Sequence, residues 1–286
     1  MITMRNAHAH EDGLLSQRAD MDEYFSGRSL YGDNFADTEI GEWYEDEKEA
    51  FTDLYIRQKA YTYEYHALNN YHGFRHLPRQ IFKDVLGLGS AKGDEFLPII
   101  NNIKRLTIVE PSELYRDVKQ VHGVPTEYVQ PNISGDLPFV ENRFDLIAAL
   151  GVLHHIPNVS YVLKECSRCL APNGLMLLRE PIISMGDWRY ARPGLTKHER
   201  GIPLGLFYIM VEDAGMQIIY KSLCHFQPLI WLITKVGIDA DNNAFVVRAD
   251  AIFARLFSWN SRYHAKKYVD KFRPTVVYIV AKKPVI

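Results

Sequence analysis

The chain has 286 residues, of which 47% are hydrophobic and 24% charged, the composition of an ordinary globular protein with one large core. The formal net charge of −2 gives no overall attraction to polyanions, so we expect no nucleic-acid partner and no stable membrane insertion. Residues 1–12 contain no apolar run, so we expect neither a signal peptide nor a membrane anchor, and a cytoplasmic protein.

The first 78 residues divide into two parts. Residues 1–36 are polar and predict a flexible N-terminal arm. From Thr38 onward, apolar and aromatic residues recur at spacings of three and four, which predicts an N-terminal helical cover over residues 37–78. The expected cover has a second helical run at Ala50–Asn70. Its aromatic residues either pack the helices on the body or also roof a ligand pocket.

Residues 79–286 alternate between strand-like and helix-like segments, a pattern typical of a parallel α/β sheet with helices on both faces. Strands are expected at Ile81–Leu88, Arg105–Glu110, Thr126–Gln130, Phe144–Leu150, Gly174–Arg179, Met216–Phe226 and Thr275–Ala281. Helices are expected at Asp94–Ile100, Ser112–Val121, Val159–Leu170 and Pro203–Ala214. The carboxyl ends of the parallel strands form the edge where ligands bind.

A glycine-rich turn follows the first expected strand. The apolar run ends at Gly87-Leu88-Gly89-Ser90, and a charged, helix-like segment begins at Asp94. Small residues let a ligand approach the backbone, and exposed N–H groups offer hydrogen bonds to polar or anionic groups. The turn is therefore a candidate ligand site, although a glycine turn after a strand also occurs without a ligand.

Glu110 closes the second expected strand, 21 residues after Gly89. A carboxylate at this position can accept hydrogen bonds from both hydroxyls of a ribose. Helix capping is the alternative role, since Pro111 and Ser112 begin the next helix. Up to this point, a nicotinamide enzyme and a methyltransferase both fit the sequence.

Three further motifs distinguish these two classes. Leu137-Pro138-Phe139 precedes Phe144-Asp145, the fourth strand runs into Leu153-His154-His155, and Ala171-Pro172-Asn173-Gly174 precedes the fifth strand. Together and in this order, residues 80–225 resemble the class I S-adenosylmethionine-dependent methyltransferases of the type 11-like branch. The resemblance implies a Rossmann-like sheet of seven strands and S-adenosylmethionine as the cofactor.

The resemblance also implies roles for individual residues. In the family, the glycine turn lies beside the methionyl part of the cofactor and the acid binds the ribose. The turn after the third strand flanks the adenine, and the end of the fourth strand lies beside the methyl donor. These roles fall in turn on Gly87, Gly89, Ser90 and Ala91; on Glu110 and Pro111; on Asn132 and Ile133; and on Leu150 and Gly151. The family usually has an acid at Gly87, a glycine at Ala91 and an Asp near Asn132.

Methyl transfer to an alcohol also requires removal of the alcohol's proton. His154, His155 and Glu180 lie at the ends of the fourth and fifth expected strands and are the candidate bases. In the family, these histidines often hold their loop together, and Glu180 can instead pair with Arg179. Both alternatives remain open.

Residues 181–201, after the fifth strand, form an expected acceptor loop. Trp188 could stack on a flat or sugar face, and Arg189 or Arg192 could bind a carboxylate or phosphate. A solvated basic loop is the alternative.

Residues 227–272 form an expected insertion before the last strand. Its amphipathic stretch Ala249–Trp259 carries basic residues around an apolar face. We expect packing on the body or on a second subunit rather than on a membrane, and a homo-oligomer is compatible with this. No metal site is expected, because Cys166 and Cys169 lie in one helix and no second cysteine pair exists.

The sequence therefore predicts an S-adenosylmethionine-dependent methyltransferase that acts on a small or glycan-like acceptor, with O-methylation favoured. One alternative is a Rossmann-type NAD(P)-binding oxidoreductase, which would not predict an antiparallel last strand. The other is a non-catalytic methyltransferase-like scaffold.

Overall fold

The computed structural model describes residues 21–57, 63–188, 190 and 192–285. Its centre is a sheet of eight strands in the order β3-β4-β2-β1-β5-β6-β8-β7. The strands are β1 (Phe82–Leu88), β2 (Ile103–Val109), β3 (Gln120–Val121), β4 (Val124–Val129), β5 (Phe144–Leu150), β6 (Leu170–Pro181), β7 (Gln217–Phe226) and β8 (Pro274–Lys282). All seven expected strands are present, with boundaries shifted by a few residues.

Strand directions confirm the predicted Rossmann-like α/β sheet. β4, β2, β1, β5 and β6 pair in parallel, whereas β8 pairs antiparallel with both β6 and β7. β7 consequently runs in the same direction as β6, and its carboxyl end lies at the same edge. Pro181 in β6 and Cys224 in β7 both pair with Val276 of β8. The last strand is antiparallel, as predicted.

The eighth strand comes from a correction in the segment after β2. The predicted helix Ser112–Val121 is wrong: the chain forms only a short 3₁₀ turn, η3 (Glu113–Tyr115), and then β3. β3 and β4 form a hairpin around His122 and Gly123, whose φ angles of 49° and 85° are both left-handed. A two-residue turn of this kind is the favoured hairpin connection, so the end of the predicted helix joins the sheet instead.

The predicted helix Asp94–Ile100 is present, but in the 3₁₀ form. The segment is a 3₁₀ helix, η2 (Asp94–Asn102), with Pro98 inside it. A proline in the middle of an α-helix removes one backbone donor and clashes with the preceding turn, so the tighter and shorter-range form is favoured.

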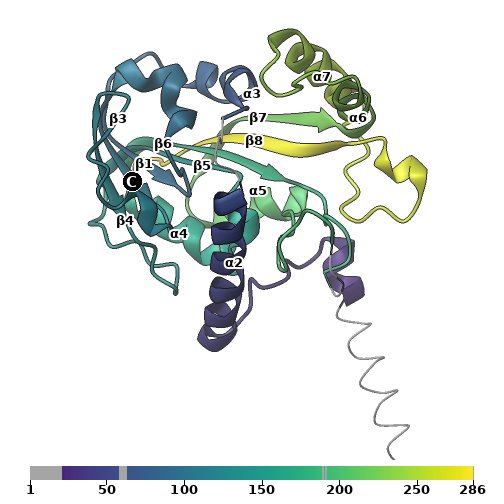
Figure 1. The fold of residues 1–286 in the computed structure, drawn as a ribbon, viewed down its shortest axis with the longest axis horizontal. Helices are drawn as coiled ribbons and strands as arrows, with labels where there is room; N and C mark the ends of the chain where they lie inside the picture. Colours follow the sequence, from purple (N-terminus) through teal and green to yellow (C-terminus); the bar gives the residue numbers. More distant parts are fainter. Residues whose placement is uncertain (1–20, 58–62, 189, 191, 286) are drawn as a thin grey trace, which may run out of the picture.

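Helices cover both faces of the sheet (Figure 1). α4 (Val159–Cys169) and α5 (Leu204–Asp213) belong to one apolar core. α3 (His66–His72) and α7 (Ala244–Leu256) contribute to the other, together with the 3₁₀ segments η1 (Phe74–His76) and η2. The other two helices predicted after residue 79, Val159–Leu170 and Pro203–Ala214, are confirmed as α4 and α5.

The N-terminal cover begins with α2 (Asp37–Arg57). Residues 58–62 of the expected second helical run lie outside the described residues, and the run resumes as α3. Of the expected flexible arm, residues 1–20 also lie outside the description. Residues 21–36 contact the body: Leu30 is buried, and the ring of Tyr31 stacks on that of Trp188 with 5.3 Å between their centroids.

Residues 227–272 contain α6 (Gln227–Lys235), α7 and η5 (Tyr268–Lys271). α7 packs against β7 through Val246, Val247 and Ala254, and Asn243 caps its start by accepting hydrogen bonds from the N–H groups of two residues of its first turn. Among the described residues, no helix is both long and apolar enough to cross a membrane.

Candidate active site

Two cavities meet at Gly89, at the edge where the parallel strands end. The first has a volume of about 350 Å³ and carries charged side chains, whereas the second has about 120 Å³ and mostly apolar walls. The first is lined by residues that include Tyr65, Ser90, Glu95, Gly151, Arg179, Glu180 and His225. The second is lined by residues that include Trp43, Leu88, Val109, Pro111, Asn132, Ile133 and Val152.

The turn after β1 requires its glycines. A Cβ on Gly87 would lie 2.2 Å from the Oγ of Ser90, and a Cβ on Gly89 would lie 2.3 Å from a methyl group of Val152. Gly89 also has a φ of 62°, in the left-handed region. Ala91 has a φ of 43°, which explains why related sequences place a glycine there.

A buried carboxylate that was not predicted from the sequence lies beside this turn. Oγ of Ser90 donates a hydrogen bond to Oε1 of Glu95 at 2.7 Å, and the Glu95 side chain is buried in the wall of the first cavity. Burial raises the pKa of Glu95 to about 7 against the opposing effect of the Ser90 hydrogen bond. The only sequence signal is an acid in the first turn after the glycines.

Glu110 ties the end of β2 to the glycine turn. Its carboxylate accepts hydrogen bonds from the backbone N–H of Ala91 at 3.0 Å and of Ser112 at 3.2 Å. Burial raises the pKa of Glu110, and these two hydrogen bonds oppose that effect. Its role at the ribose stays a prediction. Pro111, Asn132 and Ile133 line the second cavity, and Leu150 and Gly151 line the first.

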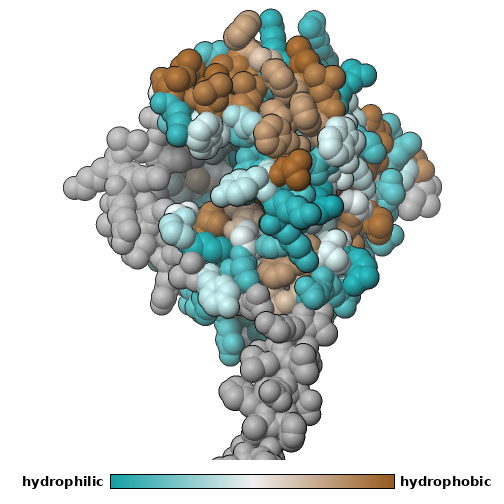
Figure 2. Space-filling model, turned by 90° about the vertical axis from the view of Figure 1, so that its right-hand side faces the viewer, coloured by the Kyte–Doolittle hydropathy of each residue, from teal (hydrophilic) through white to brown (hydrophobic). Residues whose placement is uncertain are grey.

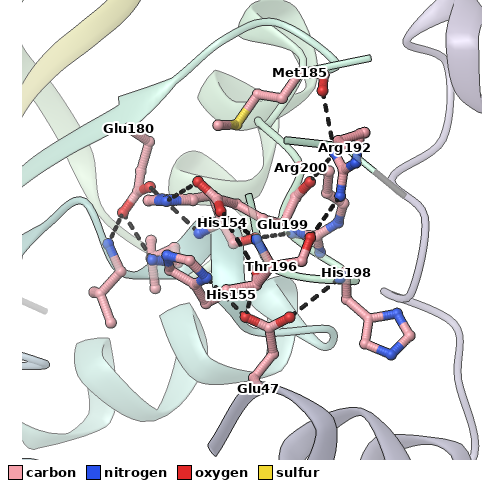
Figure 3. A network of polar contacts seen from close by, with 12 residues as sticks. Glu47, His154, His155, Glu180, Met185, Arg192, Thr196, His198, Glu199 and Arg200 are labelled. Atoms are coloured by element: carbon pink, nitrogen blue, oxygen red, sulfur yellow. Dashed lines mark hydrogen bonds and ion pairs between the residues drawn. The ribbon is translucent and has the colours of Figure 1, made fainter. Parts of the chain in front are cut away.

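Glu180 organises the loop after β5. Its side chain is fully buried, and it accepts hydrogen bonds from the backbone N–H groups of Val152 and Leu153 at 3.0 and 2.8 Å. Its other oxygen lies 2.7 Å from Nδ1 of His154. Nε2 of His154 lies 3.6 Å from Glu199, so this imidazole sits between two carboxylates (Figure 3).

This arrangement makes His154 a cation at neutral pH. Burial alone would lower the pKa of His154, but the charge and hydrogen bond of Glu180, together with Glu199, raise it to about 9. A histidine that already carries its proton, held between two acids, cannot accept another from an acceptor.

His155 connects the loop to the N-terminal cover. Its Nδ1 lies 2.9 Å from Oε2 of Glu47 in α2, and its carbonyl accepts a hydrogen bond from Nε1 of Trp43 at 2.7 Å. Burial lowers the pKa of His155, and the cationic His154 adds to this effect. Glu47 also accepts hydrogen bonds from Thr196 and from the N–H of His198. Both α2 and residues 181–201 therefore contact the loop after β5 near His155 (Figure 3).

The expected acceptor loop uses its polar groups internally. Nε1 of Trp188 donates to the carbonyl of Ser184 at 2.7 Å. The Arg192 guanidinium donates to backbone carbonyls of Met185, Thr196, Lys197 and Glu199. Neither Trp188 nor Arg192 is among the described residues that line the two cavities. Arg189 lies outside the described residues, and acceptor binding by this loop stays a prediction.

A second histidine that pairs with an acid lines the first cavity, and it was not predicted from the sequence. His225 lies at the end of β7 with a left-handed φ of 57°, and its Nε2 is 2.5 Å from Oδ1 of Asp241. Its backbone N–H donates to Asp250 at 2.7 Å. The signal was available, because His225 ends a predicted strand at the ligand edge. Asp241 could not be paired with it by sequence, since it follows α6.

One group of side chains has the composition of a metal site. His154, His155 and Glu199 each bring one ligand atom within 4.8 Å of the others. The proton on His154 already balances the neighbouring carboxylates, so we assign no metal to this group.

Comparisons with known proteins show that part of the chain is similar to methyltransferases. Residues 86–178 match the methyltransferase domain family. A tRNA U34 carboxymethyltransferase from Nautilia profundicola is 31% identical over 116 residues, which cover 37% of this chain and 36% of that protein. A ubiquinone biosynthesis O-methyltransferase from Proteus mirabilis is 26% identical over 65 residues, covering 23% of this chain and 26% of that protein. The chain thus aligns with about a third of the length of these relatives or less.

The fold has a counterpart among solved structures. A putative methyltransferase from Haloferax volcanii, solved in complex with the Trm112 methyltransferase activator, superposes with a TM-score of 0.51 at 15% identity, covering 86% of this chain and 98% of that one. The matched family region contains the end of β1, the glycine turn, Glu110 and the loop after β5. Residues 86–178 thus match the methyltransferase domain family, and the sheet around them has the Rossmann-like fold of the class I methyltransferases, which use S-adenosylmethionine as their cofactor.

Proposed function

We propose that this protein transfers a methyl group from S-adenosylmethionine to an oxygen atom of a small acceptor. The observation that carries the proposal is the pair of cavities that meet at Gly89, one charged and one apolar. S-adenosylmethionine is similarly divided, with a zwitterionic amino-acid end and a flat adenine end. The junction at Gly89 suits the sulfonium between them.

In this proposal, each part of the cofactor meets complementary groups. Adenine lies in the apolar cavity between Asn132, Ile133 and Val152, and Glu110 accepts hydrogen bonds from the ribose hydroxyls. The methionyl ammonium lies against the Ser90–Glu95 pair, and the half-buried Arg179 offsets the methionyl carboxylate. Glu95 thus supplies the acid that related sequences carry at the position of Gly87.

The base in this proposal is His225 rather than His154, His155 or Glu180. Glu180 already accepts several hydrogen bonds, and His154 is a cation between two acids. His225 lines the cavity with Asp241 on its Nε2, which leaves Nδ1 as the nitrogen that receives the acceptor's proton. The Asp241 carboxylate then stabilises the imidazolium that forms, as in other histidine–acid pairs.

The acceptor class follows from the size and walls of the charged cavity. A volume of about 350 Å³ must hold the methionyl end and the reactive part of the acceptor, which favours a small or narrow group. Tyr63, Tyr65 and Leu68 form one side of this cavity and suit a partly apolar acceptor. The relative from Proteus mirabilis is named as an O-methyltransferase, which agrees with transfer to oxygen.

Two measurements test the proposal. Calorimetric titration with S-adenosylhomocysteine should give saturable binding to a single site, and absence of binding would overturn the cofactor assignment. Incubation of the protein with fractionated cell extract and methyl-labelled S-adenosylmethionine should then label a small molecule. Mass spectrometry of that product identifies the methylated atom. Cofactor binding without label transfer to any fraction would favour the non-catalytic scaffold.

A further inference from the structure

Helix α6 is apolar along most of its length, yet none of its residues is buried. Its sequence includes Leu229-Ile230-Trp231-Leu232-Ile233, and Trp231 and Leu232 are 59% and 54% exposed. Val236, just after the helix, is 62% exposed. Helices of a monomeric domain normally bury such residues, so this helix has a surface that the described chain leaves uncovered.

Helix α7 presents a second uncovered stripe. One side of α7 packs on β7, whereas Arg248, Ile252, Leu256 and, just after the helix, Trp259 follow one another at spacings of three and four on an exposed side. Ile252, Leu256 and Trp259 are 62%, 64% and 74% exposed. An exposed stripe of apolar residues flanked by arginine is typical of a helix that lies on a lipid surface.

α6 and α7 lie together beyond the β7 edge of the sheet (Figure 1), and hydrophobic residues gather over this end of the molecule (Figure 2). We define the α6–α7 face by Trp231, Leu232, Val236, Ile252, Leu256 and Trp259. We propose that the α6–α7 face docks this protein on the surface of an anionic lipid bilayer.

Charge selects a bilayer over other occupants. Residues 227–272 contain seven Lys or Arg and four Asp or Glu, a net charge of +3, so the remaining residues carry −5 of the total of −2. Two of the four acids, Asp250 and Asp270, are buried. Lys235, Arg248, Arg255, Lys266 and Lys267 are exposed, and Nζ of Lys235 lies 4.0 Å from the ring centroid of Trp231. Basic side chains can contact anionic lipid headgroups, and exposed tryptophans can lie at the boundary between the headgroups and the acyl chains.

A second copy of the chain fits this face less well. A two-fold dimer would place the α6–α7 face against itself and bring the same arginine and lysine side chains together. Anionic headgroups instead neutralise these side chains. At nine and thirteen residues, α6 and α7 are too short to span a bilayer, so they would lie in its interface.

Vesicle flotation tests the proposal and requires neither cofactor nor acceptor. The full chain should float with vesicles of phosphatidylcholine mixed with phosphatidylglycerol, at least about tenfold more tightly than with phosphatidylcholine alone. Raised salt should weaken the binding. Equal binding to both vesicle types, or no binding to the anionic ones, would overturn the proposal.

Two double variants with matched controls locate the contact. Trp231→Ser with Leu232→Ser, and separately Arg248→Ser with Arg255→Ser on the exposed side of α7, should each weaken binding to anionic vesicles about tenfold or more. Val140→Ser, at a site that is 73% exposed, and Lys104→Ser with Lys119→Ser should leave it unchanged. Thermal melts check that each variant is folded. Sedimentation that shows a stable dimer, dissociated by the Trp231 and Leu232 changes, would assign the face to a second copy instead.

Discussion

The hydroxyl of Ser90 donates a hydrogen bond to the buried carboxylate of Glu95, with 2.7 Å between Oγ and Oε1. The contact depends on Gly87, because a side chain there would occupy the position of the Ser90 hydroxyl. Related sequences usually carry an acid at the position of Gly87. In this chain Glu95, at the start of η2, brings a carboxylate to the glycine turn, and Gly87 makes room for the serine that holds it.

The first prediction concerns the methionyl end of the cofactor. Glu95→Gln keeps the side-chain shape but removes the charge, so we expect the affinity for S-adenosylhomocysteine to fall by about tenfold or more, the effect of one charge-assisted hydrogen bond. The affinity for adenosine, which lacks the methionyl part, should not change. Calorimetry at pH 8 measures both. Glu141→Gln, at an exposed turn, is the control, and an unchanged S-adenosylhomocysteine affinity would exclude the ammonium contact.

The second prediction is the effect of Glu95 on stability. Its pKa is 4.5 in the unfolded chain and about 7 in the fold, so the folded protein binds more protons between these values. Relative to Glu95→Gln, the free energy of unfolding of the wild type should therefore fall as pH rises from 4.5 to 7, by about 3 kcal/mol in total. Urea unfolding across this range measures the difference. If the free energies of unfolding of the two proteins change with pH in the same way, the pKa of Glu95 is not raised in the folded protein.

The third prediction concerns the ribose. Glu110→Ala should weaken both S-adenosylhomocysteine and adenosine by about tenfold or more, because both carry the ribose. This pattern distinguishes Glu110 from Glu95, which should affect only the longer ligand. Glu110→Ala also removes the acceptor for the Ala91 and Ser112 N–H groups, so a thermal melt accompanies the titration. If Glu110→Ala weakens S-adenosylhomocysteine but leaves the affinity for adenosine unchanged, Glu110 only shapes the glycine turn and does not bind the ribose.

The fourth prediction treats His154 as a structural cation. Its pKa is raised from 6.5 to about 9, so its stabilising effect is complete below pH 6.5 and is lost as pH rises through 9. Compared with His154→Gln, the wild type should lose about 3 kcal/mol of unfolding free energy between these values. Urea unfolding at several pH values tests this, and His198→Gln serves as a second histidine variant nearby. A constant difference between wild type and His154→Gln would mean that His154 is neutral.

The sheet could be predicted from sequence because each strand is a local apolar run bounded by turn residues. The order and direction of β8 followed from the family resemblance. The errors lie where a local pattern competes with a single residue or a tertiary contact. Pro98 turns an expected α-helix into η2, and His122 with Gly123 turns the end of another into the β3–β4 hairpin.

The candidate site was predicted less completely, for a physical reason. Motif spacing identified the glycine turn and Glu110, whose places depend on neighbouring strands. The state of His154 depends on Glu180 and Glu199, which lie 26 and 45 residues further along the chain. Such contacts exist only after folding, so the sequence showed residues able to act as bases but not which of them were already bound to acids.

The last prediction assigns the base. His225→Asn should lower kcat for the labelled acceptor by about 10²–10⁴-fold, and Asp241→Asn should lower it by a smaller factor. Neither variant should change the affinity for S-adenosylhomocysteine by much. His122→Asn is the control, since His122 also pairs with an aspartate, Asp94, at 2.7 Å but does not line either cavity. If His225 removes the proton, the loss should appear in kcat with little change in KM for the acceptor, whereas a residue that only shapes the cavity should change KM as well. Turnover that survives in His225→Asn would instead leave alignment and water exclusion as the source of catalysis.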